Sequence, residues 1–262
     1  MKLRELLASV KDIVQLTEHP AMDMEIHGLT TNSHATSEGD VFIGMPGTRV
    51  DGGEFWESAI GAGAIAAVIS EQAAEKVPAS GQESACVIVA SDMTKVCAKL
   101  AAAFYGYPGH AMKLVGVTGT NGKTTTSHLI EYFLERADSS VALMGTLYTR
   151  WKGFNETAVH TTPFAVELQK QLAAAVNAGN EYGVMEVSSH ALAQGRVSGC
   201  QFEVAVFSNL TQDHLDYHKD MEDYFSAKAL LFTPEYLGGR AIINIDDAYG
   251  KRLVDALGKD KT

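Results

Sequence analysis

The chain has 262 residues, of which 46% are hydrophobic and 20% are charged. This composition supports packed cores and argues against a largely disordered chain. At roughly 150 residues per domain, the length fits one large or two modest domains. The formal net charge of −11 disfavours a broad binding surface for nucleic acid or an anionic membrane, although a local basic pocket for phosphate stays possible.

Cysteine usage and the N-terminus indicate the compartment. Cys86, Cys97 and Cys200 are scattered and form no CxxC pair, which argues against a disulfide scaffold or structural zinc and favours a reducing environment. Residues 1–7 begin an amphipathic helix with no apolar signal-peptide region after them. The most apolar run, 59–69, is about half the length that a membrane span needs. We therefore expect a cytoplasmic protein with no membrane or nucleic-acid partner.

The first hundred residues alternate short strand-like runs with helical ones. The expected elements are a strand at 41–44, a helix at 55–62, strands at 64–69 and 85–90, and a helix at 93–105. This helix ends in Gly106–Gly109 (GYPG), the strongest candidate linker. We therefore expect a small α/β domain at 1–108 and a second domain at 109–262.

The second part has a more regular alternation. The expected elements are strands at 114–117, 141–144, 182–187, 204–208 and 241–245, and helices at 124–134, 164–178 and 221–232. We expect the first of these helices to bury four apolar side chains, those of Leu129, Ile130, Phe133 and Leu134. Strands alternating with helices of this length predict a mostly parallel sheet covered on both faces. Ligands bind such sheets at the carboxyl ends of the strands, so the chemistry is expected just after residues 117, 187 and 208.

A glycine-rich turn, Thr118–Thr125 (TGTNGKTT), follows the first of these strands and opens a helix. Its backbone N–H groups can hold phosphate oxygens, with Lys123 reaching the β- and γ-phosphates and the Thr124 hydroxyl binding Mg²⁺. The match to the general P-loop pattern is imperfect, because the first glycine of that pattern falls at Val117. The alternative is a structural turn with a solvated lysine, but Gly-Lys-Thr-Thr in this context favours phosphate binding.

Two further strand ends carry polar residues. Glu186 ends an apolar strand, where a second Mg²⁺ contact is expected; a capping or solvated glutamate is the alternative. The run 209–218 holds two histidines and two aspartates. His214 and His218 have zinc-like i, i+4 spacing if helical, but no HExxH accompanies them, and a histidine such as His218 is more often structural. The helical pattern around Lys228 predicts an ordinary lysine with its ammonium in water.

Together these residues closely resemble the motifs of the Mur ligases, the ATP-dependent enzymes that build the peptidoglycan precursor. The shared motifs are residues 118–125, 185–190 (MEVSSH), 208–218 (SNLTQDHLDYH) and 227–228. Within the family the chain is most similar to the branch that makes the tripeptide. The features of that branch are Gly145-Thr146, Thr161-Thr162-Pro163, 188–196, and N-terminal segments at 31–33, 39–42 and 47–52.

The resemblance implies a role for each matching position. The ATP-binding residues would be Gly119, Thr120, Asn121, Gly122, Lys123, Thr124 and Thr125. One Mg²⁺ would be held by Thr124 and Glu186 and another by His214 and Lys228, with Lys228 carried as a CO₂-derived carbamate. The catalytic residues would be Lys123, Glu186, His214 and Lys228. The uridine-nucleotide pocket would use Thr31, Ser33, Thr48, Arg49 and Val50. The muramoyl-dipeptide would contact His160, Thr161, Thr162, Ser188, Gln194 and Arg196.

The implied reaction is amide formation driven by ATP. ATP would phosphorylate the D-glutamate carboxylate of UDP-N-acetylmuramoyl-L-alanyl-D-glutamate, and the amine of a diamino acid, meso-diaminopimelate or L-lysine, would displace the phosphate. The resemblance covers essentially the whole chain, which ends partway through the family's central domain. We therefore expect an incomplete P-loop-type sheet domain, no C-terminal amino-acid-binding domain, and no complete ligation by the chain alone.

The chain departs from the family's usual motifs at two places, and two other functions are alternatives to the ligase reaction. The family commonly has Asp-Ser-Arg where this chain has Asn32-Ser33-His34, and His160 stands where Asn is frequent. Another ligase of the superfamily, such as a folylpolyglutamate or cyanophycin synthetase, is one alternative, disfavoured by the uridine-type motifs. A nucleotide-binding module without ligase activity is the other, and the early end of the chain favours it.

Overall fold

The computed structural model describes residues 1–257 except 17, 48, 79–80 and 82–83. The chain divides into two compact units, Met1–Phe104 and Tyr105–Thr262. The division falls shortly before the linker expected at Gly106–Gly109. In the described residues no helix is long and apolar enough to cross a membrane.

The first unit is a five-stranded sheet with the order β1-β5-β4-β3-β2. Its strands are β1 (Ile13–Gln15), β2 (Gly28–Thr30), β3 (Asp40–Ile43), β4 (Ala66–Ser70) and β5 (Val87–Ala90). Strands β2 to β5 run parallel, and β1 pairs antiparallel with β5. The helices are α1 (Leu3–Ala8), α2 (Trp56–Gly61), α3 (Glu71–Ala74) and α5 (Met93–Phe104), with short 3₁₀ turns η1 (Pro20–Asp23), η2 (Ser33–Ala35) and η3 (Gly52–Phe55).

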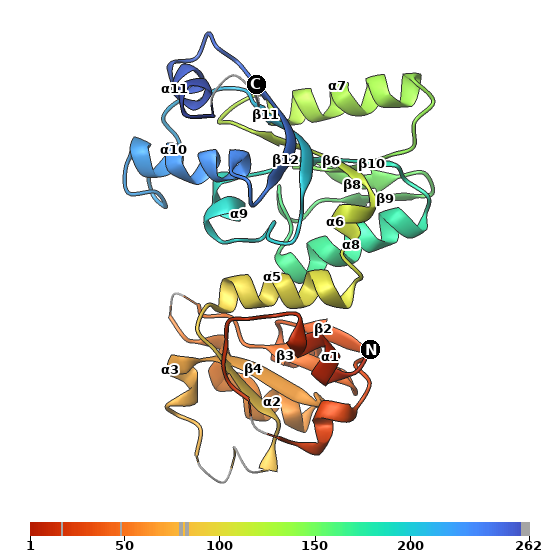
Figure 1. Ribbon diagram of the computed structural model, residues 1–262, viewed down its shortest axis with the longest axis vertical. Coiled ribbons are helices and arrows are strands. Elements are labelled where there is room, and N and C mark those ends of the chain that lie inside the picture. Colours follow the sequence, from red (N-terminus) through yellow and green to blue (C-terminus); the bar gives the residue numbers. More distant parts are fainter. Residues whose placement is uncertain (17, 48, 79–80, 82–83, 258–262) are drawn as a thin grey trace. The chain divides into compact units, whose positions relative to one another are not determined.

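Strands β3 and β4 are buried along their whole length, which explains why they read as continuous apolar runs rather than as alternating ones. Trp56 and Ala59 of α2 pack against Phe42 and Ile69 on one face. Helices α2 and α5 lie on opposite sides of this sheet (Figure 1). The strands and helices expected in this half are confirmed, with ends shifted by a few residues.

The second unit is a seven-stranded sheet with the order β12-β11-β6-β10-β7-β8-β9. Its strands are β6 (Lys113–Thr118), β7 (Val141–Met144), β8 (Tyr148–Trp151), β9 (Phe154–Thr157), β10 (Tyr182–Glu186), β11 (Phe202–Phe207) and β12 (Leu237–Ile243). The five strands from β12 to β7 are parallel, and β8 and β9 form an antiparallel hairpin at the edge. The predicted mostly parallel α/β fold is confirmed.

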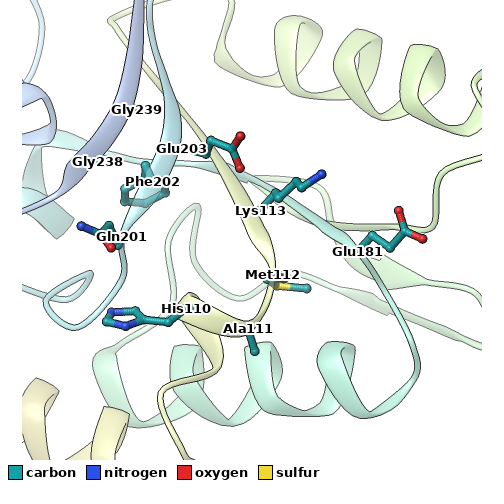
Figure 2. Close-up of a pocket in the computed structure, with 11 residues that line it drawn as sticks. His110, Ala111, Met112, Lys113, Glu181, Gln201, Phe202, Glu203, Gly238 and Gly239 are labelled. Atoms are coloured by element: carbon teal, nitrogen blue, oxygen red, sulfur yellow. The ribbon is translucent and has the colours of Figure 1, made fainter. Parts of the chain in front are cut away.

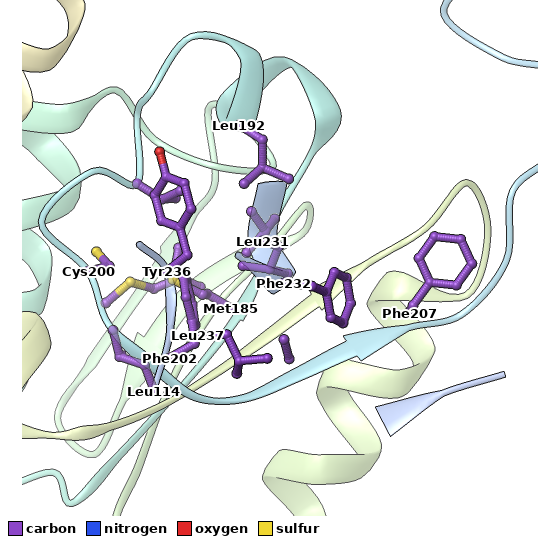
Figure 3. Packing of buried hydrophobic residues seen from close by; sticks show 14 of the residues in the cluster. Leu114, Met185, Leu192, Cys200, Phe202, Phe207, Leu231, Phe232, Tyr236 and Leu237 are labelled. Atoms are coloured by element: carbon purple, nitrogen blue, oxygen red, sulfur yellow. The ribbon is translucent and has the colours of Figure 1, made fainter. Parts of the chain in front are cut away.

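Helices cover both faces of this sheet. They are α6 (Pro108–Ala111), α7 (Lys123–Arg136), α8 (Ala165–Asn177), α9 (Ser189–Ala193), α10 (Met221–Ala229) and α11 (Ala248–Leu257), with the 3₁₀ turn η4 (Leu230–Phe232). Helices α7 and α8 lie on opposite sides of the sheet (Figure 1). Figure 3 shows part of the larger core, where Phe202 and Phe207 of β11 meet Leu231 and Phe232 of η4.

The expected inner face of α7 is partly wrong. Ile130 and Leu134 pack against the strands, but Leu129 is 50% exposed and Phe133 is 63% exposed. At helical spacing the buried stripe runs through Ser127, Ile130, Glu131 and Leu134, so Leu129 and Phe133 fall on the neighbouring face. A buried glutamate needs a partner, and Arg150 supplies it with two hydrogen bonds of 2.6 and 2.9 Å.

The sequence analysis does not predict several short elements. These are β1, β2, α3, the β8–β9 hairpin, α6, α9, α11 and the 3₁₀ turns η1, η2 and η3. The hairpin is mostly exposed and lacks a clear apolar alternation. It turns at Gly153, whose φ of +87° favours glycine, and Trp151 stacks on Phe154 across the turn at 4.1 Å.

Candidate nucleotide and metal site

Three neighbouring parallel strands bring the predicted loops to one edge of the second sheet. Strand β6 lies between β10 and β11, with Val117 opposite Glu186 and Thr118 opposite Phe207. Because parallel strands end at the same edge, the segments after residues 117, 186 and 207 converge. The structure therefore brings together the glycine-rich turn, Glu186 and the 208–218 loop.

The glycine-rich turn requires glycine at two positions. Gly119 has φ +142° and Gly122 has φ +83°, and a Cβ on Gly119 would overlap the Ser208 hydroxyl. Gly122 precedes the 14-residue helix α7 and supplies no side-chain cap. The first N–H groups of α7 point into the turn without a capping side chain, as in an anion-binding helix start.

The 208–211 loop holds the glycine-rich turn in place. The Thr120 N–H donates to the Asn209 carbonyl at 2.9 Å, and the Asn121 N–H donates to Asn209 Oδ1 at 3.0 Å. The Asn121 carbonyl accepts from the Ser208 hydroxyl at 2.7 Å and from Asn209 Nδ2 at 3.1 Å. The turn is therefore fixed before any phosphate binds.

Asn244 and Asp247, which follow β12, hold the 208–211 loop in place. Asn244 Nδ2 donates to the Ser208 carbonyl at 2.9 Å, and Asp247 Oδ2 accepts from the Leu210 N–H at 3.1 Å. Sequence reasoning did not assign these residues to the site. Their only signal is position, because they follow a strand that pairs with β11.

Glu186 is buried, and hydrogen bonds hold both of its carboxylate oxygens in place. Its Oε2 accepts from the Thr124 hydroxyl and the Thr146 hydroxyl, each at 3.0 Å, and its Oε1 accepts from the Thr146 N–H at 2.8 Å. A Cβ on Gly145 would overlap Oε1. Thr146 was not predicted as a site residue, although it too follows a strand end. A carboxylate beside a hydroxyl is the oxygen donor set that Mg²⁺ prefers.

Two lysines share one carbonyl in this site. Lys123 Nζ donates to the Gly119 and Thr120 carbonyls at 3.0 and 2.9 Å, and Lys228 Nζ donates to the Gly119 carbonyl at 2.8 Å. Burial lowers the pKa of Lys123. Burial, and then the charge of Lys123, lowers the pKa of Lys228 to about 7.

The pattern-based expectation for Lys228, an ammonium in water, is wrong. The residue is 1% exposed, and its Nζ lies 4.6 Å from the centre of the Tyr224 ring. The Tyr224 hydroxyl in turn lies 3.2 Å from Thr120 Oγ1. Tyr224 precedes Lys228 by one helical turn, so the spacing could have indicated it, but the sequence analysis missed it.

His214 and His218 have different surroundings. His214 is in the left-handed region at φ +53°, and its side chain is 43% exposed, with Nε2 3.5 Å from Asp213 Oδ2. His218 is buried and bonds to Ser189 and Asp223. The two histidines lie in a turn rather than on a helix, so the zinc-like spacing does not apply. In the described part of the chain no three His, Cys, Asp or Glu side chains gather as a metal cluster.

The residues expected to contact the peptide form one network with Glu186. The Thr162 hydroxyl donates to the Glu186 carbonyl at 2.8 Å and accepts from the Ser188 N–H at 3.1 Å. Arg196 donates to the Thr162 carbonyl at 3.0 Å and to Gln194 Oε1 at 2.6 and 2.8 Å.

The two remaining positions of this group lie beside the network. The Thr161 hydroxyl accepts from the Thr146 hydroxyl at 3.1 Å. His160 is exposed and lies edge-on to Phe164 at 5.1 Å, while the Arg196 guanidinium lies 4.0 Å from the centre of the same ring. Phe164 therefore contacts both His160 and Arg196. It was not predicted as a site residue.

In the first unit, the expected uridine-pocket residues follow two neighbouring strands. Thr31 and Ser33 follow β2, and exposed Arg49 and Val50 lie in the loop after β3, which pairs with β2 in parallel. Thr48 lies outside the described residues. These loops occupy adjacent strand ends, the position where ligands bind such sheets.

A pocket of about 740 Å³ lies at the opposite end of the second sheet, where its parallel strands begin (Figure 2). Its lining comes from the starts of β6, β11 and β12 and includes Lys113, Glu203 and Gly239. None of the predicted site residues lines it. This pocket therefore does not mark the candidate site, which is identified by the strand ends and the glycine-rich turn.

Comparison with known proteins shows the family to which the chain belongs. The model of the Mur ligase middle domain matches residues 117–262, and that of the Mur ligase family catalytic domain matches residues 25–105. The UDP-N-acetylmuramoyl-L-alanyl-D-glutamate--2,6-diaminopimelate ligase of Trichormus variabilis is 71% identical over 261 residues, which is 100% of this chain and 52% of that protein. The ligase of the same name from Synechocystis is 62% identical, again over 100% of this chain and 53% of its own length.

A solved structure of a UDP-N-acetylmuramoyl-L-alanyl-D-glutamate--2,6-diaminopimelate ligase has a TM-score of 0.78 and 30% identity to this chain, covering 98% of this chain and 49% of that one. The chain thus spans about half the length of the curated relatives it matches. Since the middle-domain model covers more than half of its residues, and this region carries the phosphate-binding turn, Glu186 and Lys228, the chain belongs to the Mur ligase family.

Proposed function

We propose that the chain is the nucleotide- and acceptor-binding part of an ATP-dependent ligase of cytoplasmic peptidoglycan precursor synthesis. The ligase adds 2,6-diaminopimelate to UDP-N-acetylmuramoyl-L-alanyl-D-glutamate. The names of the relatives that match the whole chain support this substrate pair. The observation that carries the proposal is the convergence of Lys123, the Thr124–Glu186 pair and buried Lys228 on one phosphate-binding turn.

The two units take separate roles in this proposal. Residues 1–108 bind the uridine nucleotide through Thr31, Ser33 and the 48–50 loop. Residues 109–262 bind ATP through Gly119–Thr125. The muramoyl-dipeptide is held by the network of Thr162, Ser188, Gln194 and Arg196 in the second unit, together with Thr161 and His160 beside it.

The residues present fit two magnesium ions. Thr124 and Glu186 would hold one through a hydroxyl and a carboxylate. His214 and Lys228 would hold the other, with Lys228 as a carbamate, because an amine is a poor ligand for Mg²⁺ and a carbamate offers anionic oxygens. The lowered pKa of Lys228 supports this, since only the neutral amine reacts with CO₂. Bound Mg²⁺ supplies charge neutralisation for the triphosphate.

The chain's own residues then organise phosphoryl and acyl transfer. An oxygen of the D-glutamate carboxylate attacks the γ-phosphorus of ATP, the bond to the β–γ bridging oxygen breaks, and ADP leaves. The amine of diaminopimelate attacks the acyl carbon, phosphate leaves, and the amine loses a proton. Lys123 and the N–H groups of the turn stabilise the phosphate charge, while Arg196 and Ser188 orient the peptide carboxylate.

Binding of ATP by this chain tests the first step. In isothermal calorimetry with Mg²⁺, we expect Lys123→Ala to weaken ATP binding by about tenfold or more, a loss of roughly 1.4 kcal/mol. The matched control is Lys170→Ala, because Lys170 is an exposed lysine on α8 of the same unit. Equal ATP binding by the wild-type and Lys123→Ala chains would contradict the assigned site.

A further inference from the structure

Ser189, His218 and Asp223 form a hydrogen-bonded series beside the candidate site. His218 Nε2 lies 2.9 Å from the Ser189 hydroxyl, and His218 Nδ1 lies 3.3 Å from Asp223 Oδ2. Ser189 and His218 are 1% and 2% exposed. Neither side chain has an assigned role in the ligase reaction proposed above.

A hydrogen-bonded series of serine, histidine and aspartate is also found in hydrolase triads, and Ser189 lies three residues after the end of β10. Burial excludes this activity, because a nucleophilic hydroxyl must be open to a substrate carbonyl. Ser189 is the first residue of α9, and its hydroxyl is closed off by the protein. The series therefore connects parts of the fold rather than attacking a substrate.

The His218 ring joins two helices that carry site residues. Ser189 begins α9 directly after Ser188, which belongs to the proposed peptide-binding network. Asp223 lies in the first turn of α10, and Lys228 is on the same helix. The imidazole thus links the start of α9 to the start of α10, the helix that presents the reactive lysine.

The backbone of His218 supports a strained residue. The N–H groups of Tyr217 and His218 donate to the His214 carbonyl at 3.1 and 2.9 Å. His214 has φ +53°, a conformation that a residue other than glycine keeps only when its surroundings hold it. The His190 ring packs edge-on against the His214 ring at 4.9 Å.

We propose that His218 is a positioning residue that fixes His214 in the left-handed turn and ties it to α9 and α10 through Ser189 and Asp223. This inference rests on the proposed function only in its consequence, which is that His214 is presented to the magnesium ion of the nucleotide site. The brace, meaning the hydrogen bonds of His218 to His214, Ser189 and Asp223, does not depend on the proposed function.

The experiment compares Ser189→Ala and His218→Gln with Ser198→Ala in the full chain. Ser198 is a matched control, because its hydroxyl is also buried and lies 3.0 Å from a side chain outside the series, the Tyr236 hydroxyl of the same unit. Two properties are measured. One is amide hydrogen exchange across residues 214–218, and the other is the Mg²⁺ concentration that gives half-maximal ATP binding.

We expect Ser189→Ala and His218→Gln to accelerate exchange at 214–218 and to raise the half-saturating Mg²⁺ concentration roughly tenfold to hundredfold, with ATP binding in the absence of Mg²⁺ unchanged. Ser198→Ala is expected to lower thermal stability without either change. Unchanged exchange in Ser189→Ala would overturn the inference, and so would faster exchange with an unchanged Mg²⁺ requirement. If the wild-type chain binds no ATP, the proposed function fails, and the exchange data still decide whether the brace exists.

Discussion

Lys228 combines a buried amine with a second cation nearby. Burial and the charge of Lys123 both disfavour its ammonium form, and its pKa falls from 10.5 to about 7. Above pH 7 most of the side chain is therefore neutral, while an exposed lysine stays protonated. The neutral amine is a nucleophile for CO₂, so the lowered pKa supports the proposed carbamate.

We expect a carbamate to form on Lys228 near pH 8 and to decrease strongly near pH 6, because the neutral fraction rises through the pKa of about 7. The measurement is carbon-13 NMR of the chain in labelled bicarbonate. Lys228→Met serves as the negative control. A carbamate signal that persists in Lys228→Met, or one that does not change between the two pH values, would contradict this assignment.

Gly145 shows how closely the site is built around Glu186. A Cβ at this position would overlap Glu186 Oε1, so Gly145→Ala has to displace the carboxylate. We expect a rise of roughly tenfold or more in the Mg²⁺ requirement for ATP binding.

Gly61→Ala is a suitable control for this substitution. Gly61 is in α2, with open space where the Cβ would lie. There the substitution should add about 0.4–1 kcal/mol of stability. If calorimetry gives the same Mg²⁺ requirement for Gly145→Ala and the wild type, Gly145 does not protect the carboxylate.

Some of the candidate site residues can be predicted from the local sequence, and others cannot. Lys123, Thr124 and Glu186 sit where a strand end and a phosphate-binding turn predict them, because local sequence determines both features. Lys228 could not be located this way, since its burial depends on the turn that packs on it from 109 residues away in sequence. Thr146, Asn209 and Asp247 were missed for a different reason: each follows a strand, but the local sequence does not show that it bonds to Glu186, to the glycine-rich turn or to Leu210.

At the level of elements, α7 is the instructive case. Its apolar residues cover more than one face, and the pattern alone does not decide which face the sheet takes. The structure buries Glu131 instead of Phe133, because Arg150 of the unpredicted hairpin satisfies the carboxylate. A hydrogen bond from another element therefore determines how α7 is oriented.

The exposure of Phe133 leads to a stability prediction. We expect Phe133→Ser to change the free energy of unfolding by about 0.5 kcal/mol or less, because the ring is already in water. Leu172→Ala in α8 should cost roughly 2–5 kcal/mol, since Leu172 is fully buried in the larger core. Urea unfolding followed by circular dichroism measures both. A similar loss in the two variants would show that the face assigned to α7 is wrong.

For the whole molecule, the alternation of strands and helices predicted the parallel sheets and the edge where the loops converge. This succeeded because a parallel strand needs a crossover helix, which leaves a long and regular pattern. The antiparallel hairpin and the short strands β1 and β2 leave no such pattern. Strand β1 is fixed by pairing with β5, which is distant in sequence. Strand β2 and the hairpin pair with neighbouring strands, but they are too short to leave a pattern of their own.

The central claim is that this chain binds both ends of the nucleotide-linked peptide. The most direct measurement is calorimetric binding of UDP-N-acetylmuramoyl-L-alanyl-D-glutamate, with UDP alone as the reference. We expect the peptide-bearing ligand to bind about tenfold tighter or more, because residues of the second unit add contacts to those of the uridine pocket. Binding no tighter than that of UDP, or no binding of either ligand to a folded sample, would contradict the claim.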